Sequence, residues 1–294
     1  MNRSTIAQRA PRFVAVIFLA VVPVLLADEL PPAELPGPLV IVGGGTVPAE
    51  AREMFVALGG KDQAKIVYVP TASEYADTPA EHEGMLKPWR AYKPASIQLL
   101  HTRDRAVADS PEFVKPLTEA TAVWFGGGDQ GRITAAYRGT LFEKELRKLH
   151  ARGGVIGGTS AGAAVQSDPM ITGGSTKAET GPGLGLLPGF VIDQHFVARN
   201  RQKRLAGVIA DHPGLVGLGI DESTAVVAQG RKLRVVGKST ATVMLAAGGG
   251  EPESTQVAKP DTSLDIVELR QAAAKRAEKK PGSNGPAKAT ERPR

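Results

Sequence analysis

Short apolar runs alternate with longer helical stretches along the first half of this 294-residue chain. The apolar runs are rich in Val and Ile, as strands buried on both faces are, and cover residues 39–42, 66–69, 96–100, 121–125 and 154–157. The helical stretches cover residues 48–58, 78–92, 111–120, 131–137 and 141–151, and a further helix opens at Ala161. Such alternation produces βαβ crossovers, so the sequence predicts an α/β fold with a mostly parallel sheet and helices on both faces.

The pattern changes after Leu215, where helical stretches give way to short strands. Residues 223–228 and 232–236 flank a glycine turn, and residues 242–246 follow. Together they predict an antiparallel edge on the parallel sheet, which is a common arrangement. After Ala246 the sequence analysis identifies no further strand or helix before the basic tail.

The net charge of +6 comes from the two ends of the chain. Residues 1–27 carry +3 and residues 270–294 carry +6, which leaves −3 for residues 28–269. A mildly acidic body argues against a groove that follows phosphates, and an aromatic content of 5% offers few surfaces for stacking bases. Nucleic acid is therefore not an expected partner.

Residues 1–27 have the pattern of a secretory signal peptide, with three arginines before an apolar run from Phe13 to Leu26. A bilayer span takes about 20 apolar residues, and this run is shorter. We therefore expect cleavage near Ala27, export to the periplasm or the cell exterior, and no stable membrane span after processing. An uncleaved amphiphilic anchor is the alternative.

The rest of the chain divides into three predicted parts. Residues 28–38 form a proline-rich spacer, residues 39–269 one folded domain, and residues 270–294 a disordered basic tail without an apolar face. The chain has no cysteine, which excludes disulfides, a thiolate nucleophile and Cys-ligated zinc.

The motif Gly158-Thr-Ser160-Ala-Gly162 directly follows the fifth predicted strand. A G-x-S-x-G sequence between a buried strand and a helix is typical of a nucleophile elbow, a sharp turn that exposes the serine oxygen above the sheet edge. The amide of Ala161 then lies where an oxyanion develops during acyl transfer. The alternative is a turn of small residues that holds a serine by chance, and the strand before it favours catalysis by Ser160.

A second glycine loop, residues 126–128, follows the fourth predicted strand. Ligands of open parallel sheets bind beyond the carboxyl ends of the strands, so this loop and the elbow are expected to meet. The amides of Gly127 and Gly128 are then candidate oxyanion donors. A similar run at residues 43–45 has Pro48 where a dinucleotide fingerprint has its third glycine, so no nucleotide cofactor is expected there.

A serine nucleophile needs a base, and the chain has five histidines. His195 lies in a dense polar group after an apolar run, and this setting makes it the candidate. Glu222 is the candidate for the acid that orients the imidazole, with Asp221 and Asp193 as alternatives. Other histidines are predicted on polar helix faces or in a loop: His82, His150 and His212.

Four blocks occur in order along the chain: residues 158–165 (GTSAGAAV), 183–187 (GLGLL), 193–196 (DQHF) with the arginines that follow, and 217–222 (GLGIDE). They resemble the cyanophycinase family of serine peptidases, which also includes aspartyl dipeptidase. The resemblance implies a flavodoxin-like sheet related to class I glutamine amidotransferases, with serine in place of the cysteine nucleophile. It assigns three roles, to a nucleophile, a base and an orienting acid, without metal or organic cofactor: Ser160, His195 and Glu222.

The resemblance also implies a substrate and its pocket. The reaction is hydrolysis of cyanophycin, multi-L-arginyl-poly-L-aspartate, to β-Asp-Arg dipeptides through an acyl-enzyme, and a homodimer is consistent with it. A general aspartyl or isoaspartyl dipeptidase is the alternative enzyme, and a non-catalytic exported binding protein on the same scaffold is the alternative from another class. Six residues lie in or beside the pocket: Gln130, Asp193, Gln194, Arg199, Arg201 and Arg204.

The arginines after His195 are predicted to set substrate choice. Arg201 and Arg204 are three apart and share a face if a helix begins here, with Arg199 near its start. Paired guanidiniums grip carboxylates bidentately, which lysine does not reproduce. The alternative is a solvated basic face.

Overall fold

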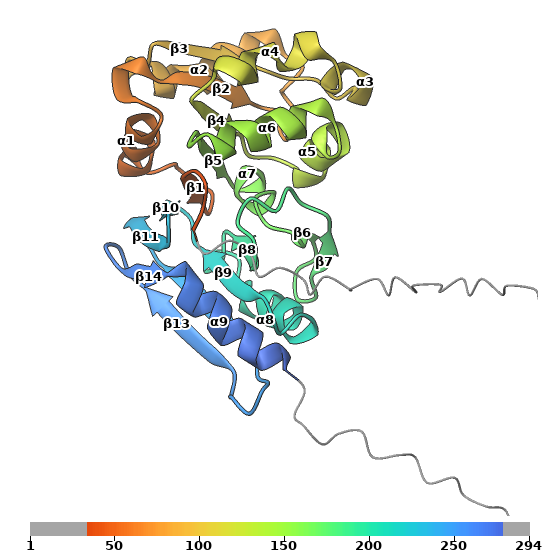
Figure 1. Ribbon diagram of the computed structural model, residues 1–294, viewed down its shortest axis with the longest axis vertical. Helices are drawn as coiled ribbons and strands as arrows, with labels where there is room; N and C mark the ends of the chain where they lie inside the picture. The colour runs from red at the N-terminus through yellow and green to blue at the C-terminus, as the bar shows by residue number, and fades with distance from the viewer. Residues whose placement is uncertain (1–33, 279–294) are drawn as a thin grey trace, which may run out of the picture. The chain divides into compact units, whose positions relative to one another are not determined.

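A computed structural model describes residues 34–278 (Figure 1). The predicted signal peptide and most of the predicted spacer lie outside the described residues. The strands are β1 (Leu39–Val42), β2 (Lys65–Val69), β3 (Ser96–Leu99), β4 (Ala122–Phe125), β5 (Val155–Thr159), β6 (Met170–Gly173), β7 (Glu179–Gly181), β8 (Phe190–Gln194), β9 (Val216–Ile220), β10 (Thr224–Gln229), β11 (Lys232–Gly237), β12 (Ala241–Leu245), β13 (Ser254–Ala258) and β14 (Ser263–Asp265). The helices are α1 (Ala49–Leu58), the 3₁₀ turn η1 (Lys61–Gln63), α2 (Pro79–Arg90), α3 (Arg105–Ala108), α4 (Pro111–Glu119), α5 (Gln130–Tyr137), α6 (Leu141–Ala151), α7 (Ala161–Ala164), α8 (Gln202–Asp211) and α9 (Ile266–Ala277).

The main sheet has eight strands in the order β14-β11-β10-β1-β5-β4-β2-β3. Strands β1 to β5 run parallel to one another, and β10, β11 and β14 add an antiparallel edge. The order β3-β2-β4-β5 is that of a flavodoxin-like sheet, with β1 in the fifth place. The predicted α/β fold is confirmed, as are the predicted antiparallel strands at residues 223–228 and 232–236.

Successive residues of the main-sheet strands enter two separate cores, which is why helices lie on both faces. Val40 and Val42 of β1 face a cluster that includes α1, whereas Leu39 and Ile41 face a cluster that includes α4, α5 and α6. Figure 1 shows α1 and α6 on opposite sides of β4 and β5. Each such fully buried side chain stabilises the fold by roughly 1.5–3 kcal/mol, so both helical layers contribute to holding the sheet.

A second sheet of four strands, in the order β13-β12-β9-β8, was not predicted from the sequence. Strands β8 and β9 are parallel and joined by α8, so the alternation of strand and helix continues in this separate sheet. Residues 242–246, predicted as part of the antiparallel edge of the main sheet, lie largely in β12, which pairs with β9 and β13. The prediction that residues 242–246 pair antiparallel was right, and the prediction that they join the main sheet was wrong.

The chain after Ala246 contains elements that were not identified from the sequence. Strands β13 and β14 and helix α9 follow, and α9 includes residues 270–277 of the segment predicted as a disordered tail. Helix α9 begins where the Asp265 carboxylate accepts hydrogen bonds from two amides of its first turn. It buries Ile266 and Ala273 in the core of the second sheet, and this burial stabilises it.

The packed domain also begins earlier than Leu39. Leu35, in the predicted spacer, is buried, and its amide donates a hydrogen bond of 3.1 Å to the Gly230 carbonyl. The imidazole of His150 is buried too, rather than placed on a polar helix face, and its Nε2 bonds the Gly37 carbonyl at 2.8 Å. These contacts attach the end of the spacer to β10–β11 on one side and to α6 on the other.

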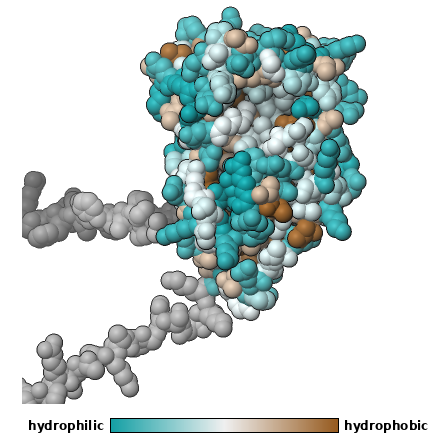
Figure 2. All heavy atoms as spheres, turned by 180° about the vertical axis from the view of Figure 1, so that it is seen from behind, coloured by the Kyte–Doolittle hydropathy of each residue, from teal (hydrophilic) through white to brown (hydrophobic). Residues whose placement is uncertain are grey.

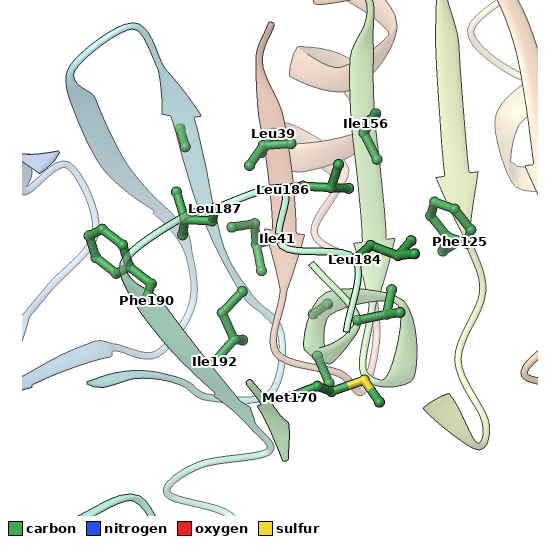
Figure 3. Close-up of a cluster of buried hydrophobic side chains, with 14 of the residues drawn as sticks. Leu39, Ile41, Phe125, Ile156, Met170, Leu184, Leu186, Leu187, Phe190 and Ile192 are labelled. Carbon is green, nitrogen blue, oxygen red and sulfur yellow. The ribbon is translucent and has the colours of Figure 1, made fainter. Parts of the chain in front are cut away.

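One buried hydrophobic cluster joins the two sheets (Figure 3). It contains Ile41 of β1 and Ile156 of β5 from the main sheet, and Phe190 and Ile192 of β8 from the second sheet. Leu187, from the segment before β8, belongs to the same cluster. Because protein cores are close-packed and resist deformation, this cluster fixes the end of β8 relative to the end of β5.

The surface carries few large hydrophobic side chains. Within residues 34–278 the exposed ones are Tyr75, Val107, Val197 and Val257. Figure 2 shows that on one face the hydrophobic residues form small separate groups among hydrophilic ones. No helix in this part of the chain is long and apolar enough to cross a membrane.

Candidate active site

The serine elbow predicted from the G-x-S-x-G motif lies at the carboxyl end of β5. Ser160 connects β5 to α7 with φ of 53°, a left-handed conformation that costs a non-glycine residue on the order of 1–3 kcal/mol. The turn closes because its neighbours are glycines. A Cβ on Gly158 would collide with the carbonyl of Gly162, and a Cβ on Gly162 with the carbonyl of Phe125.

The three side chains assigned as nucleophile, base and orienting acid are in contact. Ser160 Oγ lies 2.9 Å from Nε2 of His195, and Nδ1 of His195 lies 2.5 Å from Oε1 of Glu222. An ionised carboxylate only accepts hydrogen bonds, so Nδ1 carries the proton and Nε2 accepts from the serine hydroxyl. A general base for Ser160 requires this tautomer.

These side chains come from the carboxyl ends of strands in both sheets. Ser160 follows β5 of the main sheet, whereas His195 follows β8 and Glu222 comes two residues after β9, both in the second sheet (Figure 1). Strands β8 and β9 are paired in parallel with Gln194 opposite Ile220, so their ends lie side by side. The base and the acid are thus brought together by strand pairing.

The two alternative acids have other partners. Asp221 accepts hydrogen bonds from two main-chain amides of the turn after His195 and from a serine hydroxyl. Asp193 is fully buried, and both of its oxygens accept from Arg204. Glu222 is therefore the acid in contact with the imidazole.

The surroundings lower the pKa of His195 below its ordinary value of 6.5. Burial is the largest cause, because a site with little water disfavours the charged imidazolium. The charges of Arg199 and Arg201 act in the same direction, and Glu222 opposes them. His195 is consequently neutral, and able to accept a proton, at neutral pH and somewhat below.

The glycine loop after β4 meets the elbow, as the position of both at strand ends predicted. A Cβ built on Gly127 would lie 3.5 Å from the Cβ of Ser160. Gly128 has φ of 136° and packs so closely on the carbonyl of Ala72 that only glycine fits. Within residues 34–278 no acceptor is hydrogen-bonded to the amides of Gly127, Gly128 or Ala161, which makes all three candidates for binding an oxyanion.

A polar pocket of about 510 Å³ opens beside Ser160. Its wall includes Gln130 of α5 and Gln194 of β8, together with the three arginines singled out in the sequence. The structure therefore gathers the predicted pocket residues around the nucleophile, except that Asp193 lies beneath the wall as the buried partner of Arg204.

The three arginines have different amounts of free hydrogen-bonding capacity. Arg204 is 3% exposed and binds both oxygens of Asp193, and another of its N–H groups donates at 2.5 Å to a carbonyl in the β6–β7 turn. Arg201 donates to the main-chain and side-chain carbonyls of Gln194 at 2.6 and 2.9 Å. Arg199 is exposed, and no acceptor within the described residues contacts its guanidinium. Arg199 therefore retains the most capacity to bind an anion.

The hairpin of β6 and β7 forms one wall of the pocket, and the sequence analysis missed it. Nε2 of Gln130 donates to the carbonyls of Ile171 and Thr172 at 2.8 and 3.0 Å. Gln130 thus holds this wall in place as well as lining the pocket. The Gly173-Gly174 pair, between the apolar run Met170-Ile171 and a polar stretch, is the turn signal that marks such a hairpin.

The glycine run at residues 43–45 is a second missed feature. It was rejected as a cofactor loop, and in the structure it packs against the catalytic candidates instead. The carbonyl of Gly43 accepts the amide of His195 at 2.6 Å, and a Cβ on Gly45 would lie 3.3 Å from Oε2 of Glu222.

The Ser160 hydroxyl lines the pocket, the imidazole of His195 contacts it, and the carboxylate of Glu222 contacts the imidazole, while the candidate amide donors lie in the adjoining turns. Together they have the arrangement that acyl transfer needs: a nucleophile beside a base, a base held by an acid, and donors next to the nucleophile. Among residues 34–278 no group of three or more His, Asp and Glu side chains is placed to hold a metal ion.

The chain is similar to several known proteins. The model of peptidase family S51 matches residues 39–236. The cyanophycinase of Geminocystis herdmanii is 31% identical over 218 residues, covering 70% of this chain and 79% of its own length. The cyanophycinase of Synechococcus elongatus is 34% identical over 221 residues, covering 71% and 68%. A crystal structure of a peptidase from an acI-B1 actinobacterium aligns with a TM-score of 0.57 at 22% identity, covering 79% of this chain and 98% of that one, which supports the fold.

Proposed function

Because the chain belongs to peptidase family S51, it is a serine-type peptidase, and we propose that Ser160, His195 and Glu222 form its catalytic triad. The observation that carries the proposal is the 2.9 Å contact between Ser160 Oγ and the unprotonated Nε2 of His195. The tautomer is set by the Glu222 carboxylate, and the lowered pKa of His195 keeps the base neutral near pH 7.

In the proposed reaction Nε2 of His195 takes the hydroxyl proton while Ser160 Oγ attacks an aspartyl carbonyl carbon. The resulting oxyanion binds the amides of Gly127, Gly128 and Ala161. The tetrahedral intermediate collapses, the peptide C–N bond breaks, and the imidazolium gives its proton to the leaving amine. Water then attacks the acyl-enzyme with the imidazole again as base, which releases the acid product and restores the serine.

The proposed substrate is cyanophycin, whose units carry a free α-carboxylate on each arginine. Two lines of support are the family relatives named cyanophycinase and the cationic wall of the pocket. Arg199, whose guanidinium has no acceptor within the described residues, is the group proposed to grip a substrate carboxylate bidentately. Arg201 and Arg204 contribute by shaping that wall.

Incubation of the purified protein with cyanophycin, followed by chromatography of the soluble products, tests the proposal. We expect β-Asp-Arg dipeptide from the wild-type protein and none from Ser160→Ala. Cleavage of short aspartyl or isoaspartyl peptides without any release from cyanophycin would favour a general dipeptidase. Failure of a fluorophosphonate probe to label Ser160 would favour a binding protein.

Export is proposed from the sequence of residues 1–27 alone. Mass analysis of protein from its host is expected to give a mature chain that begins near Asp28. Soluble protein that retains Met1 would contradict export. Homodimer formation also stays a prediction, which sedimentation of the mature chain decides.

A further inference from the structure

The loop that leaves β1 contacts all three turns that carry the proposed triad. Three consecutive carbonyls, from the last residue of β1 into this loop, each accept a main-chain amide from a different turn. The turns are the elbow after β5, the turn after β8 and the turn after β9. The hydrogen bonds are Ser160 N to Val42 O (3.0 Å), His195 N to Gly43 O (2.6 Å) and Ser223 N to Gly44 O (2.9 Å).

The three donor residues share an unusual positive φ. Ser160, His195 and Ser223 have φ of 53°, 51° and 53°, in the left-handed region that non-glycine residues avoid. Such conformations persist only when surrounding structure imposes them. Here the surrounding structure includes one short loop, whose successive carbonyls bind one strained turn each.

Gly44 is the residue of this loop that lies against the base itself. It has φ of 113°, and a Cβ built on it would lie 2.8 Å from Nδ1 of His195 and still closer to Cε1 and Nε2. Real Cβ atoms do not approach other atoms so closely, so any side chain here displaces the imidazole. The imidazole has little freedom to give way, because it must stay 2.9 Å from Ser160 Oγ and 2.5 Å from Glu222 Oε1.

We propose that Gly44 is a positioning residue, because its Cα, which carries no side chain, forms the surface against which the His195 imidazole packs. The loop that contains Gly44 holds the proposed base of the second sheet in position beside the proposed nucleophile of the main sheet. The inference rests on the proposed function, since it assigns a role within the same triad. It also assigns a role to the glycine run at residues 43–45, which the sequence analysis considered only as a possible cofactor loop.

Comparison of Gly44→Ala with the control Gly60→Ala distinguishes displacement of the His195 imidazole from the general cost of placing alanine at a positive φ. Gly60 has nearly the same φ, 111°, but a Cβ there meets nothing closer than 3.6 Å, and it lies after α1. Both variants are expected to lose a few degrees of Tm from the forced positive φ. Only Gly44→Ala is expected to slow phosphonylation of Ser160 by a fluorophosphonate, by about a hundredfold, because displacement of a catalytic group by about 1 Å has that effect.

Two further readouts report on the imidazole directly. The proton NMR signal of His195 Nδ1–H and the pH profile of the labelling rate are expected to change in Gly44→Ala and to stay as in wild type in Gly60→Ala. Equal labelling rates and unchanged profiles in both variants would overturn the inference. Absence of labelling in the wild-type protein would instead refute the proposed function, so the two failures are distinguishable.

If Gly44→Ala folds poorly, a double-mutant cycle measured by thermal denaturation tests whether Gly44 acts on the His195 imidazole. In the His195→Ala background the imidazole is gone, so Gly44→Ala is expected to lower Tm no more than Gly60→Ala does. In the wild-type background its cost is expected to be larger. The same loss of Tm in both backgrounds, or failure of the double variant to fold, would show that Gly44 serves backbone conformation alone.

Discussion

The two sheets contribute to the site in different ways. The main sheet carries the proposed nucleophile and the proposed oxyanion donors on two turns whose geometry is set by local sequence, because Gly158, Gly162 and Gly128 each lie where a Cβ would collide with backbone atoms. The second sheet carries the proposed base and the proposed acid without any such motif, and positions them through strand pairing and a core shared with the main sheet. The nucleophile is therefore specified by local sequence, and its partners are specified by tertiary packing.

The largest expected effect tests the local half of this comparison. Ser160→Ala is expected to lower kcat by a factor on the order of 10⁶, because removal of the nucleophile leaves only the residual effect of the binding groups. Stability should be unchanged or slightly higher, since the strained turn keeps its glycines and its backbone hydrogen bond. Turnover and thermal denaturation are the two measurements, and turnover near wild type would sink the assignment of Ser160.

The next largest expected effect tests the second sheet, whose proposed catalytic residues are positioned by tertiary packing. Glu222→Gln is expected to lower kcat by about 10⁴, as an amide in place of the orienting carboxylate favours the wrong tautomer of the imidazole. Glu119→Gln is the control, because this exposed carboxylate pairs with Lys65 away from the pocket. Equal activity of the two variants would mean that contact at 2.5 Å with Nδ1 of His195 has no part in catalysis.

The same contrast explains how far the sequence could be interpreted. The elbow and its partner loop were predictable because strand, glycines and serine lie within a few residues of one another. The choice of Glu222 over Asp221 and Asp193 stayed open, since all three acids adjoin apolar strands in the sequence. Only the fold shows that Asp193 accepts hydrogen bonds from Arg204 and that Asp221 accepts them from main-chain amides.

The second sheet was missed for a related reason. Its strands resemble the main-sheet strands in composition, and nothing local says which sheet a strand joins. Residues 270–277 of α9 read as part of a basic tail because their many Ala, Lys and Arg residues obscure a narrow stripe of buried side chains. The run Asp265-Ile-Val-Glu268 is a capping pattern that marks the start of that helix, and it was overlooked.

A smaller effect separates the arginines that bind substrate from those that support the second sheet. Arg199→Lys is expected to lower kcat/KM for aspartyl substrates about tenfold with unchanged Tm, in line with roughly 1.5–3 kcal/mol for hydrogen bonds to charged groups. Arg204→Lys is expected to lower Tm as well, because lysine leaves an oxygen of the buried Asp193 without its partner. Kinetics and calorimetry on both variants make the test. If Arg204→Lys loses activity with full stability, then Arg204 binds substrate directly.

The smallest expected effect is on the pH dependence of activity. It tests the second sheet, because the group that titrates is His195 of that sheet and not Ser160 of the main sheet. The pKa of His195 is lowered, mainly by burial, so kcat/KM should fall with a midpoint below the ordinary value of 6.5. Arg199 contributes to that lowering, and Arg199→Gln should therefore move the midpoint toward higher pH, whereas Lys148→Gln on the exposed face of α6 should not.

Stability should follow the same group with a sign that can be worked out. Between the lowered folded pKa of His195 and its ordinary value, the unfolded chain binds a proton that the folded protein does not. Stability therefore decreases as the pH falls through that window, whereas above it, where His195 is neutral in both states, this group adds no pH dependence and the higher stability is kept. Labelling rates and Tm measured in parallel from neutral to acid pH check both claims. A midpoint above 6.5, or one that Arg199→Gln leaves in place, would show that the packing of the second sheet does not tune the base.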